Sequence, residues 1–234
     1  FIRHGADTAR IKWVVSSDRR AIAWVEVSTA GISTAYVAWA DGSELEALPI
    51  PSPAPPTVLR PLALTDDRTA FLVDLEASSK PSSLPFVTYT HLTEYHIHER
   101  AAYPLPGEPL CPCGAAITPD ARLLARLEAL NGQGPFALHL WDLPNQLDLR
   151  VPAPALPYRM AGDLLLSDSG ALAVYAVAAG VGPETGQFQE QYALVVVDIA
   201  AQTQRLLAGP GPVRYRPLAF EDGDGTVLAV GVNQ

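Results

Sequence analysis

Short apolar runs alternate with short polar turns along this chain, and one kind of turn recurs about every fifty residues. Each of these turns contains an aspartate close to Ser, Thr, Gly or Arg. The five aspartates are Asp18, Asp66, Asp120, Asp168 and Asp224, at intervals of 48, 54, 48 and 56 residues. Such a period is typical of a repeat protein, in which each repeat is one supersecondary unit that buries its apolar surface against its neighbours.

Each turn lies between two apolar runs of strand length. The runs before the turns are Ile11–Val15, Leu59–Leu64, Ala115–Ile117, Asp163–Leu166 and Tyr215–Phe220, and those after them are Ala21–Val27, Ala70–Leu75, Leu123–Leu130, Ala171–Ala178 and Thr226–Val232. In the first four repeats a third strand and a short fourth strand follow, and the third strands end near Trp39, His98, Trp141 and Val197. Four strands joined by hairpins form one blade of a β-propeller. The pattern therefore predicts an all-β chain, a β-propeller of four-stranded antiparallel blades.

The number of repeats predicts about five blades, four complete and a partial closing one. We expect one propeller domain over residues 1–234, with repeats at about 10–50, 57–107, 113–152, 158–209 and 213–234. Phe1–Thr8 could supply a third strand to the closing blade, or further blades could follow. Because the chain begins at Phe1, we expect it to be part of a longer one.

The repeated residues resemble those of a known family. Ser or Thr, then Asp, then Arg or Gly, followed by an apolar run and an aromatic strand that ends in Asp, resembles the blades of TolB-like β-propellers, from about Ile11 to Val232. Trp141-Asp142 also resembles the tryptophan–aspartate repeats. Such blades occur in periplasmic scaffold proteins, in the propeller caps of peptidases and in sensor ectodomains. The resemblance implies protein or peptide binding and a periplasmic or extracellular location, and it identifies no catalytic residue.

Composition and charge narrow the functions further. The chain is 48% hydrophobic, which suffices for a core, and its 22 prolines fall mostly between the apolar runs. Its net charge is −9, with acidic residues scattered along the sequence, which indicates a soluble surface rather than an acidic patch for a basic partner. No basic stripe is present to bind nucleic acid, and no apolar stretch reaches the length of a transmembrane segment.

Catalytic motifs are missing from the sequence. It has no Gly-x-Ser-x-Gly elbow, no phosphate-binding glycine loop before a helix and no His-Glu-x-x-His pair. A hydrolase could instead pair carboxylates across the propeller channel, as some propeller glycosidases do, and the candidates are Glu26, Asp74, Asp163 and Glu184. We favour solvated carboxylates without a catalytic role, and we predict no cofactor.

Histidines and cysteines gather in the second repeat. His96 and His98 are two residues apart on a predicted strand, so their side chains would leave the same face. Cys111 and Cys113 follow, and imidazole and thiolate together would suit zinc. A Cys111–Cys113 disulfide and free thiols are the alternatives. We predict that this cluster is structural and holds no metal.

A polar loop is the first candidate for a contact surface. Residues 180–191 separate two strands of the fourth repeat, and Glu184, Gln187, Phe188 and Gln189 are its predicted binding residues. The four tryptophans, Trp13, Trp24, Trp39 and Trp141, are expected to be core residues. The sequence favours a non-enzymatic module that binds a protein or peptide, in a sensory or scaffolding role, with a hydrolase as the alternative.

Overall fold

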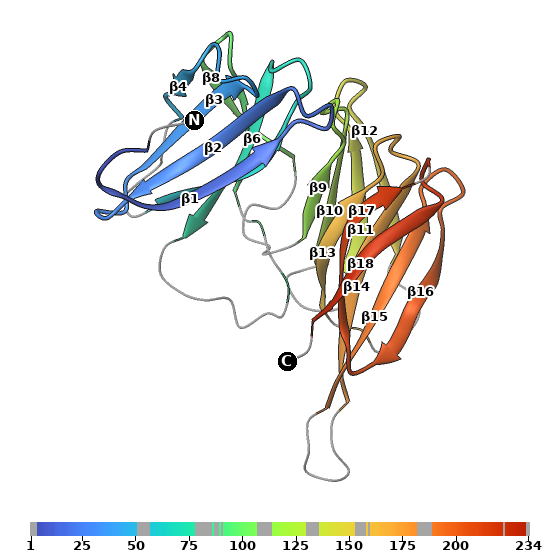
Figure 1. The fold of residues 1–234 in the computed structure, drawn as a ribbon. Coiled ribbons are helices and arrows are strands. Elements are labelled where there is room, and N and C mark those ends of the chain that lie inside the picture. Colours follow the sequence, from blue (N-terminus) through green and yellow to red (C-terminus); the bar gives the residue numbers. More distant parts are fainter. Residues whose placement is uncertain are drawn as a thin grey trace. The chain divides into compact units, whose positions relative to one another are not determined.

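The structure is a computed structural model that describes residues 4–50, 57–77, 86, 89, 91–106, 114–129, 136–152, 158, 160–181, 189–221 and 223–232. These residues form strands joined by turns (Figure 1). The described ranges contain no helix that is long and apolar enough to cross a membrane.

The strands form five antiparallel sheets, four with four strands and one with two. The first sheet contains β1 (Thr8–Val15), β2 (Ala21–Ser28), β3 (Ser33–Trp39) and β4 (Glu46–Leu48), and the second contains β5 (Thr57–Leu64), β6 (Ala70–Ala77), β7 (Leu92–His96) and β8 (Ala101–Pro104). The third contains β9 (Ala115–Ile117), β10 (Leu123–Ala129), β11 (Phe136–Asp142) and β12 (Leu147–Pro152). The fourth contains β13 (Met160–Leu166), β14 (Leu172–Val181), β15 (Gln189–Asp198) and β16 (Thr203–Gly211), and the fifth contains β17 (Arg214–Glu221) and β18 (Thr226–Val232).

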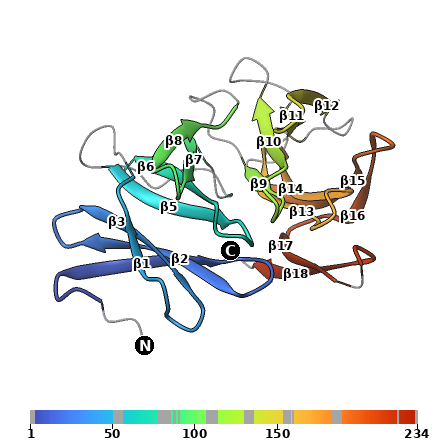
Figure 2. The ribbon, with the colours of Figure 1, turned by 90° about the horizontal axis from the view of Figure 1, so that it is seen from above.

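The chain divides into two compact units. The first unit comprises Phe1–Pro81, Tyr89–Leu110 and Pro119–Ala121 and contains the first two sheets. The second comprises Ser82–Thr88, Cys111–Thr118 and Arg122–Gln234 and contains the other three. Within each unit, successive sheets lie face to face (Figure 2). Apolar side chains fill the space between them.

Apolar clusters between sheets form the cores. In the first unit, alanines and valines of β2 and β3 pack against Leu59, Phe71, Val73 and Tyr95 of the second sheet. In the second unit, one cluster joins the third and fourth sheets and another joins the fourth and fifth. Small residues on one sheet and large ones on the next allow the sheets to interdigitate. Four-stranded antiparallel sheets that pack in this way are propeller blades, which confirms the predicted fold class.

A buried hydroxyl organises the turn between the first two strands of each four-stranded sheet. The four hydroxyl residues are Ser16, Thr65, Thr118 and Ser167. Each accepts a hydrogen bond of 2.9–3.0 Å from the backbone N–H five residues later. The residue three positions after each hydroxyl has a positive φ, and these residues are Arg19, Arg68, Ala121 and Gly170.

This geometry corrects the alignment of the repeats. Asp18 and Asp67 lie two residues after the hydroxyl and accept hydrogen bonds inside their own turn. Asp66 instead accepts hydrogen bonds from the neighbouring blade, at 2.8 and 3.1 Å from Ser17 Oγ and at 3.1 Å from the Asp18 N–H. In the second unit, the Ser169 hydroxyl likewise donates to Asp224. Two of the five repeated aspartates therefore link adjacent blades.

Several other expectations change. β14 pairs with β15 as far as Val181 opposite Gln189, so Gln189 is a strand residue, because the hairpin is longer than the polar sequence suggested. Glu184, Gln187 and Phe188 lie outside the described residues. Ala6 and Asp7 lie in a turn, and Thr8 already belongs to β1. Phe1–Arg3, the rest of the predicted closing strand, lie outside the described residues.

The tryptophans are not all core residues. Trp24 is buried and stacks on Tyr36, with ring centroids 5.3 Å apart. Trp13 is 64% exposed, because it lies on the face of β1 opposite to the core of the first unit. Trp39 and Trp141 are partly buried.

Candidate functional site

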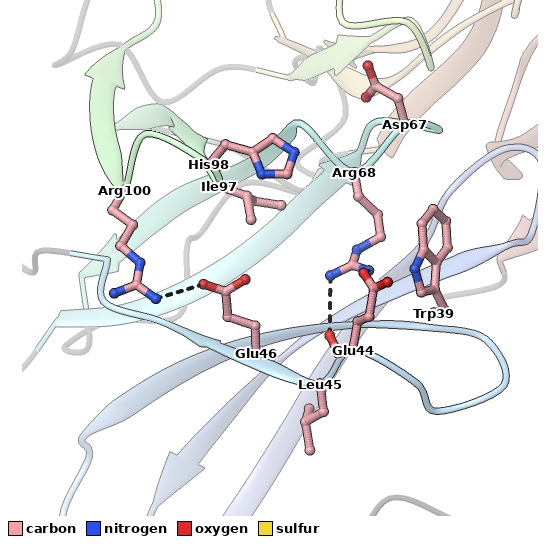
Figure 3. A pocket seen from close by; sticks show the side chains of 9 residues that line it. All are labelled: Trp39, Glu44, Leu45, Glu46, Asp67, Arg68, Ile97, His98 and Arg100. Atoms are coloured by element: carbon pink, nitrogen blue, oxygen red, sulfur yellow. Dashed lines mark hydrogen bonds and ion pairs between the residues drawn. The ribbon is translucent and has the colours of Figure 1, made fainter.

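A pocket of about 540 Å³ opens in the first unit where turns of its two sheets meet. We call it the junction pocket (Figure 3). Trp39 ends β3, Glu44 and Leu45 lie between β3 and β4, and Glu46 begins β4. The second sheet supplies Asp67 and Arg68 from the β5–β6 turn, and Ile97, His98 and Arg100 from the β7–β8 turn.

Arg68 connects the two sheets at one side of the junction pocket. Its side chain is only 8% exposed, and its Nη1 atom lies 2.8 Å from Glu44 Oε2. Its Nη2 atom donates to the Glu44 carbonyl oxygen at 3.2 Å, and its guanidinium lies 4.7 Å from the Trp39 ring centre. A guanidinium stacked on an indole and hydrogen-bonded to a carboxylate is a rigid arrangement. Arg68 therefore holds the turn of the second sheet against the first.

Arg100 and Glu46 form the opposite side. Their side chains are 67% and 33% exposed, and Arg100 Nη2 lies 3.2 Å from Glu46 Oε1. Solvent screens such a pair, so a ligand could replace either partner at little cost. Leu45 lies between the two glutamates in sequence and is 59% exposed. This side of the pocket therefore presents both charged and apolar groups to solvent.

Asp67 adds a third carboxylate. Burial opposes its ionisation, but hydrogen bonds from the Thr69 N–H, the Thr69 hydroxyl and the Thr65 hydroxyl outweigh that effect and lower its pKa below the usual value. Asp67 is therefore ionised at neutral pH. On β7, burial raises the pKa of the Tyr95 hydroxyl, which has no hydrogen-bond partner among the described residues.

Asp74 and Asp163, two of the predicted carboxylates, are nearly inaccessible. Asp74 Oδ2 lies 2.6 Å from Arg60 Nη2, and its Oδ1 atom accepts a hydrogen bond from the His91 N–H. The Tyr89 ring covers the Arg60 guanidinium at 4.3 Å. Asp163 lies at a bulge of β13 with a φ of 50°, and its side chain is 2% exposed.

Glu26 lies on β2 in the first sheet and is held by several donors. Its carboxylate accepts hydrogen bonds from the Thr8 hydroxyl, the Trp24 indole and the Gly5 N–H, and it lies 3.0 Å from His4 Nδ1. Burial alone would raise its pKa, but these hydrogen bonds keep the pKa below its usual value. Glu184, the remaining candidate, lies outside the described residues. Glu26, Asp74 and Asp163 belong to three different sheets.

The predicted histidine pair does not share a strand. β7 ends at His96, and His98 lies in the turn that follows, so the two-residue strand period does not apply to them. His96 lies 3.4 Å from carboxylate oxygens of Glu94 and of Glu99. His98 lines the junction pocket.

The described residues do not test whether the predicted cluster of histidines and cysteines binds a metal. Cys111 and Cys113 lie outside the described residues. Within the ranges that the structure describes, no group of three or more His, Cys, Asp or Glu residues could hold a metal ion. The absence of a bound metal therefore stays a prediction.

Most residues of the junction pocket were missed from the sequence. The repeat pattern identified the turns, but it did not indicate that turns of different sheets contact each other. Arg68 lies at a turn position of positive φ that Gly170, the residue best suited to it, occupies in the fourth repeat. Arg19 occupies the same position in the first repeat and is exposed, so this pattern alone did not single out Arg68.

Comparisons with known proteins support the fold. No protein-family model matches the chain, and no curated protein sequence matches it. Among solved structures, TolB from Agrobacterium tumefaciens is similar over 84% of this chain and 64% of its own, with a TM-score of 0.56 and 13% identity. TolB from Acinetobacter baumannii is similar over 96% of this chain and 55% of its own, with a TM-score of 0.57 and 14% identity.

A peptidase has a similar structure. Dipeptidyl peptidase 4 from Porphyromonas gingivalis matches 97% of this chain and 37% of its own, with a TM-score of 0.63 and 11% identity. The chain thus spans between about a third and two thirds of the length of these three proteins. The chain is a TolB-like β-propeller in fold. At such low identity the similarity extends to the fold alone.

Proposed function

We propose that this chain is a non-enzymatic propeller module that binds a protein or peptide, and that the junction pocket is a contact site. The observation that carries the proposal is the pocket itself, which places an exposed leucine beside charged groups on a rigid frame. Interfaces combine an apolar anchor with a polar rim in this way. Leu45 is the anchor, and Glu46 and Arg100 are the rim.

The charges of the junction pocket favour a particular peptide. Glu44, Glu46 and Asp67 outnumber Arg68 and Arg100, and both arginines already have a carboxylate partner. A segment with a lysine or arginine beside an apolar residue would complement this pocket. The net charge of −9 would also speed its approach.

The alternative is a hydrolase, or the propeller part of one. The similarity to the fold of a dipeptidyl peptidase is compatible with it. Two observations argue against a hydrolase. Asp74 forms an ion pair with Arg60, and Glu26 accepts several hydrogen bonds that keep its carboxylate ionised. A general acid needs a pKa near the working pH, and the pKa of Glu26 is shifted in the opposite direction. These observations favour the binding module.

Two further statements belong to the proposal. Residues 1–234 form one propeller domain, and the protein works outside the cytoplasm, in the periplasm or in the extracellular space. The TolB-like blade pattern supports both. Fractionation of cells that carry the tagged full-length protein tests the location, and a purely cytoplasmic signal contradicts it.

Binding can be tested with a random peptide library displayed on phage. The purified 234-residue protein is the bait, and the affinity of the enriched peptides is measured by fluorescence anisotropy. Leu45→Asp should weaken binding about tenfold or more, because an interface anchor contributes about 1.4 kcal/mol or more. Leu147→Asp is the matched control, because Leu147 on β12 is similarly exposed at 64%.

The outcomes separate the hypotheses. Enriched peptides with a basic residue beside an apolar one, whose binding is lost only in Leu45→Asp, support the proposal. No enrichment, or equal loss in both variants, contradicts it. Turnover of ester, glycoside or peptide substrates that is abolished by one carboxylate substitution would favour the hydrolase.

A further inference from the structure

The blades that form the junction pocket can be compared with two other blades of the same chain. In each four-stranded sheet, the turn between the third and fourth strands contains one residue other than glycine with a positive φ. In sheet order, these residues are Glu44, Arg100, Gln146 and Gln202. Together with the positive-φ residues of the first turns, they identify equivalent positions in successive blades.

The charges of the junction pocket do not recur at the equivalent positions of the third and fourth sheets. The three positions hold Glu44, Arg68 and Arg100 in the first two sheets and Gln146, Gly170 and Gln202 in the third and fourth. An apolar cluster joins the third and fourth sheets without these charged groups. The two ion pairs of the pocket are therefore particular to the first two blades and are not a requirement of the blade itself.

These two ion pairs differ in how firmly they are held (Figure 3). Arg68 is buried, bonds to Glu44 through both terminal nitrogens and stacks on Trp39. Arg100 is largely exposed and approaches Glu46 with one nitrogen, which lies 3.2 Å from Oε1. Among the described residues, Glu46 Oε2 has no hydrogen-bond donor. The first pair is therefore part of the frame, whereas the second can be replaced.

A guanidinium from a partner can bind Glu46 better than Arg100 does. It presents parallel N–H groups that can bond to both oxygens of one carboxylate, and such two-bonded pairs are the stronger ones. Arg100 uses only one oxygen of Glu46. The ammonium of a lysine is a point charge without this fork of donors. The geometry therefore favours arginine over lysine as the ligand group.

We infer that the junction pocket binds an arginine side chain of the partner, which bonds to both carboxylate oxygens of Glu46 and displaces Arg100. Arg100 is an internal competitor, because it occupies Glu46 in the free protein. Leu45, the neighbour of Glu46, contacts the apolar residue beside that arginine. The volume of about 540 Å³ lies in the range of pockets that admit small ligands. This inference rests on the proposed function and adds the ligand group, its acceptor and its competitor.

Acetyl-leucyl-arginine amide is the probe, because it is a small peptide that carries both groups. Its binding to the isotopically labelled 234-residue protein is measured by NMR titration, in which the Nε–H signal of Arg100 reports the displacement. We expect saturable shifts. Two matched peptides replace arginine with lysine or with citrulline, which has the shape of arginine without its charge. The lysine peptide should bind about threefold more weakly or worse, and the citrulline peptide about tenfold or worse.

Arg100→Gln is the decisive variant, because Gln146 and Gln202 occupy the same turn position in other blades. It should tighten probe binding about two- to fivefold, since the probe no longer has to break an exposed ion pair. Arg122→Gln is the matched control. Arg122 is 59% exposed and lies 3.2 Å from Asp142, so this variant removes the same charge from a similar pair elsewhere and should leave the affinity unchanged.

Glu46→Gln should weaken probe binding about tenfold or more, because a neutral amide cannot form the charged pair. Binding that Arg100→Gln leaves unchanged or weakens overturns the inference, and weaker binding would assign Arg100 to the ligand contact. Equal affinity for the lysine or citrulline peptide also overturns it. In these cases the proposed function still stands if Leu45→Asp loses the enriched peptides. The absence of saturable shifts in both the parent and Arg100→Gln overturns the inference, whereas the absence of any enriched peptide contradicts the proposed function.

Discussion

Replacing Thr65 with valine tests the idea that a buried hydroxyl organises each blade. Thr65 is 5% exposed and Ala70 is 4% exposed. The Ala70 N–H donates to Thr65 Oγ1 at 2.9 Å, and the Thr65 N–H donates to the Ala70 carbonyl at 3.1 Å. Valine keeps the shape of threonine and preserves the second bond, but it removes the acceptor of the first.

The expected loss of stability follows from the Ala70 N–H, which the substitution leaves without an acceptor. A buried N–H without a partner costs about 1–3 kcal/mol, so we expect Thr65→Val to lower the free energy of unfolding by about 2 kcal/mol. For a protein of this length, that loss lowers Tm by about 4–8 °C. The hydroxyl of Thr65 also helps to lower the pKa of Asp67, so the variant should raise that pKa.

Urea unfolding and hydrogen exchange of the Ala70 amide are the measurements. Thr65→Ser is the matched control, because Ser16 and Ser167 serve the same role in other blades. It removes one methyl group, which costs about 0.8 kcal/mol, and retains the acceptor. A Thr65→Val protein as stable as the parent, or a Thr65→Ser protein that is equally destabilised, would refute the reasoning.

Three further predictions concern contacts between and within blades. Asp66→Ala should destabilise the protein more than Ser17→Ala, because Asp66 also accepts from a backbone N–H, and a double-mutant cycle should give a coupling energy of about 0.5–1 kcal/mol. Arg68→Met should lower the free energy of unfolding in urea by about 2–4 kcal/mol, because it removes the bonds to Glu44 and the stacking on Trp39. An unchanged free energy of unfolding would show that these contacts do not contribute to stability. Glu26→Gln should destabilise at pH 7, and the gap to the parent should shrink as pH falls below about 4.5, because the folded carboxyl has the lower pKa; a gap that is constant with pH would contradict this assignment.

The strands were predictable because their signals are local. Apolar runs such as Ala171–Ala178 lie between turns rich in Ser, Asp and Gly, and the structure has β14 there. The ends of strands were less predictable. The polar residues 189–191 belong to β15, because pairing with β14 provides hydrogen-bond partners for their backbone N–H and C=O groups. This pairing does not depend on the polarity of their side chains. His98 was placed on a strand because the apolar pattern continues through Ile97, but the chain turns after His96.

The candidate site depended on contacts between distant residues. Glu44 and Arg68 are 24 residues apart, and their charges alone do not distinguish them from other exposed pairs. Trp39 resembled a core residue in the sequence, yet the Arg68 guanidinium covers its ring at the pocket. The side chains of Asp74 and Asp163, two candidate carboxylates of the hydrolase alternative, are only 1% and 2% exposed, which no local pattern indicates.

The sequence by itself determined the repeat, the β-propeller class and the position of the turns, because strand period and turn chemistry are properties of neighbouring residues. The tertiary structure alone decided what the turns do. The packing of one sheet on the next places Asp66 beside Ser17 and Arg68 beside Glu44.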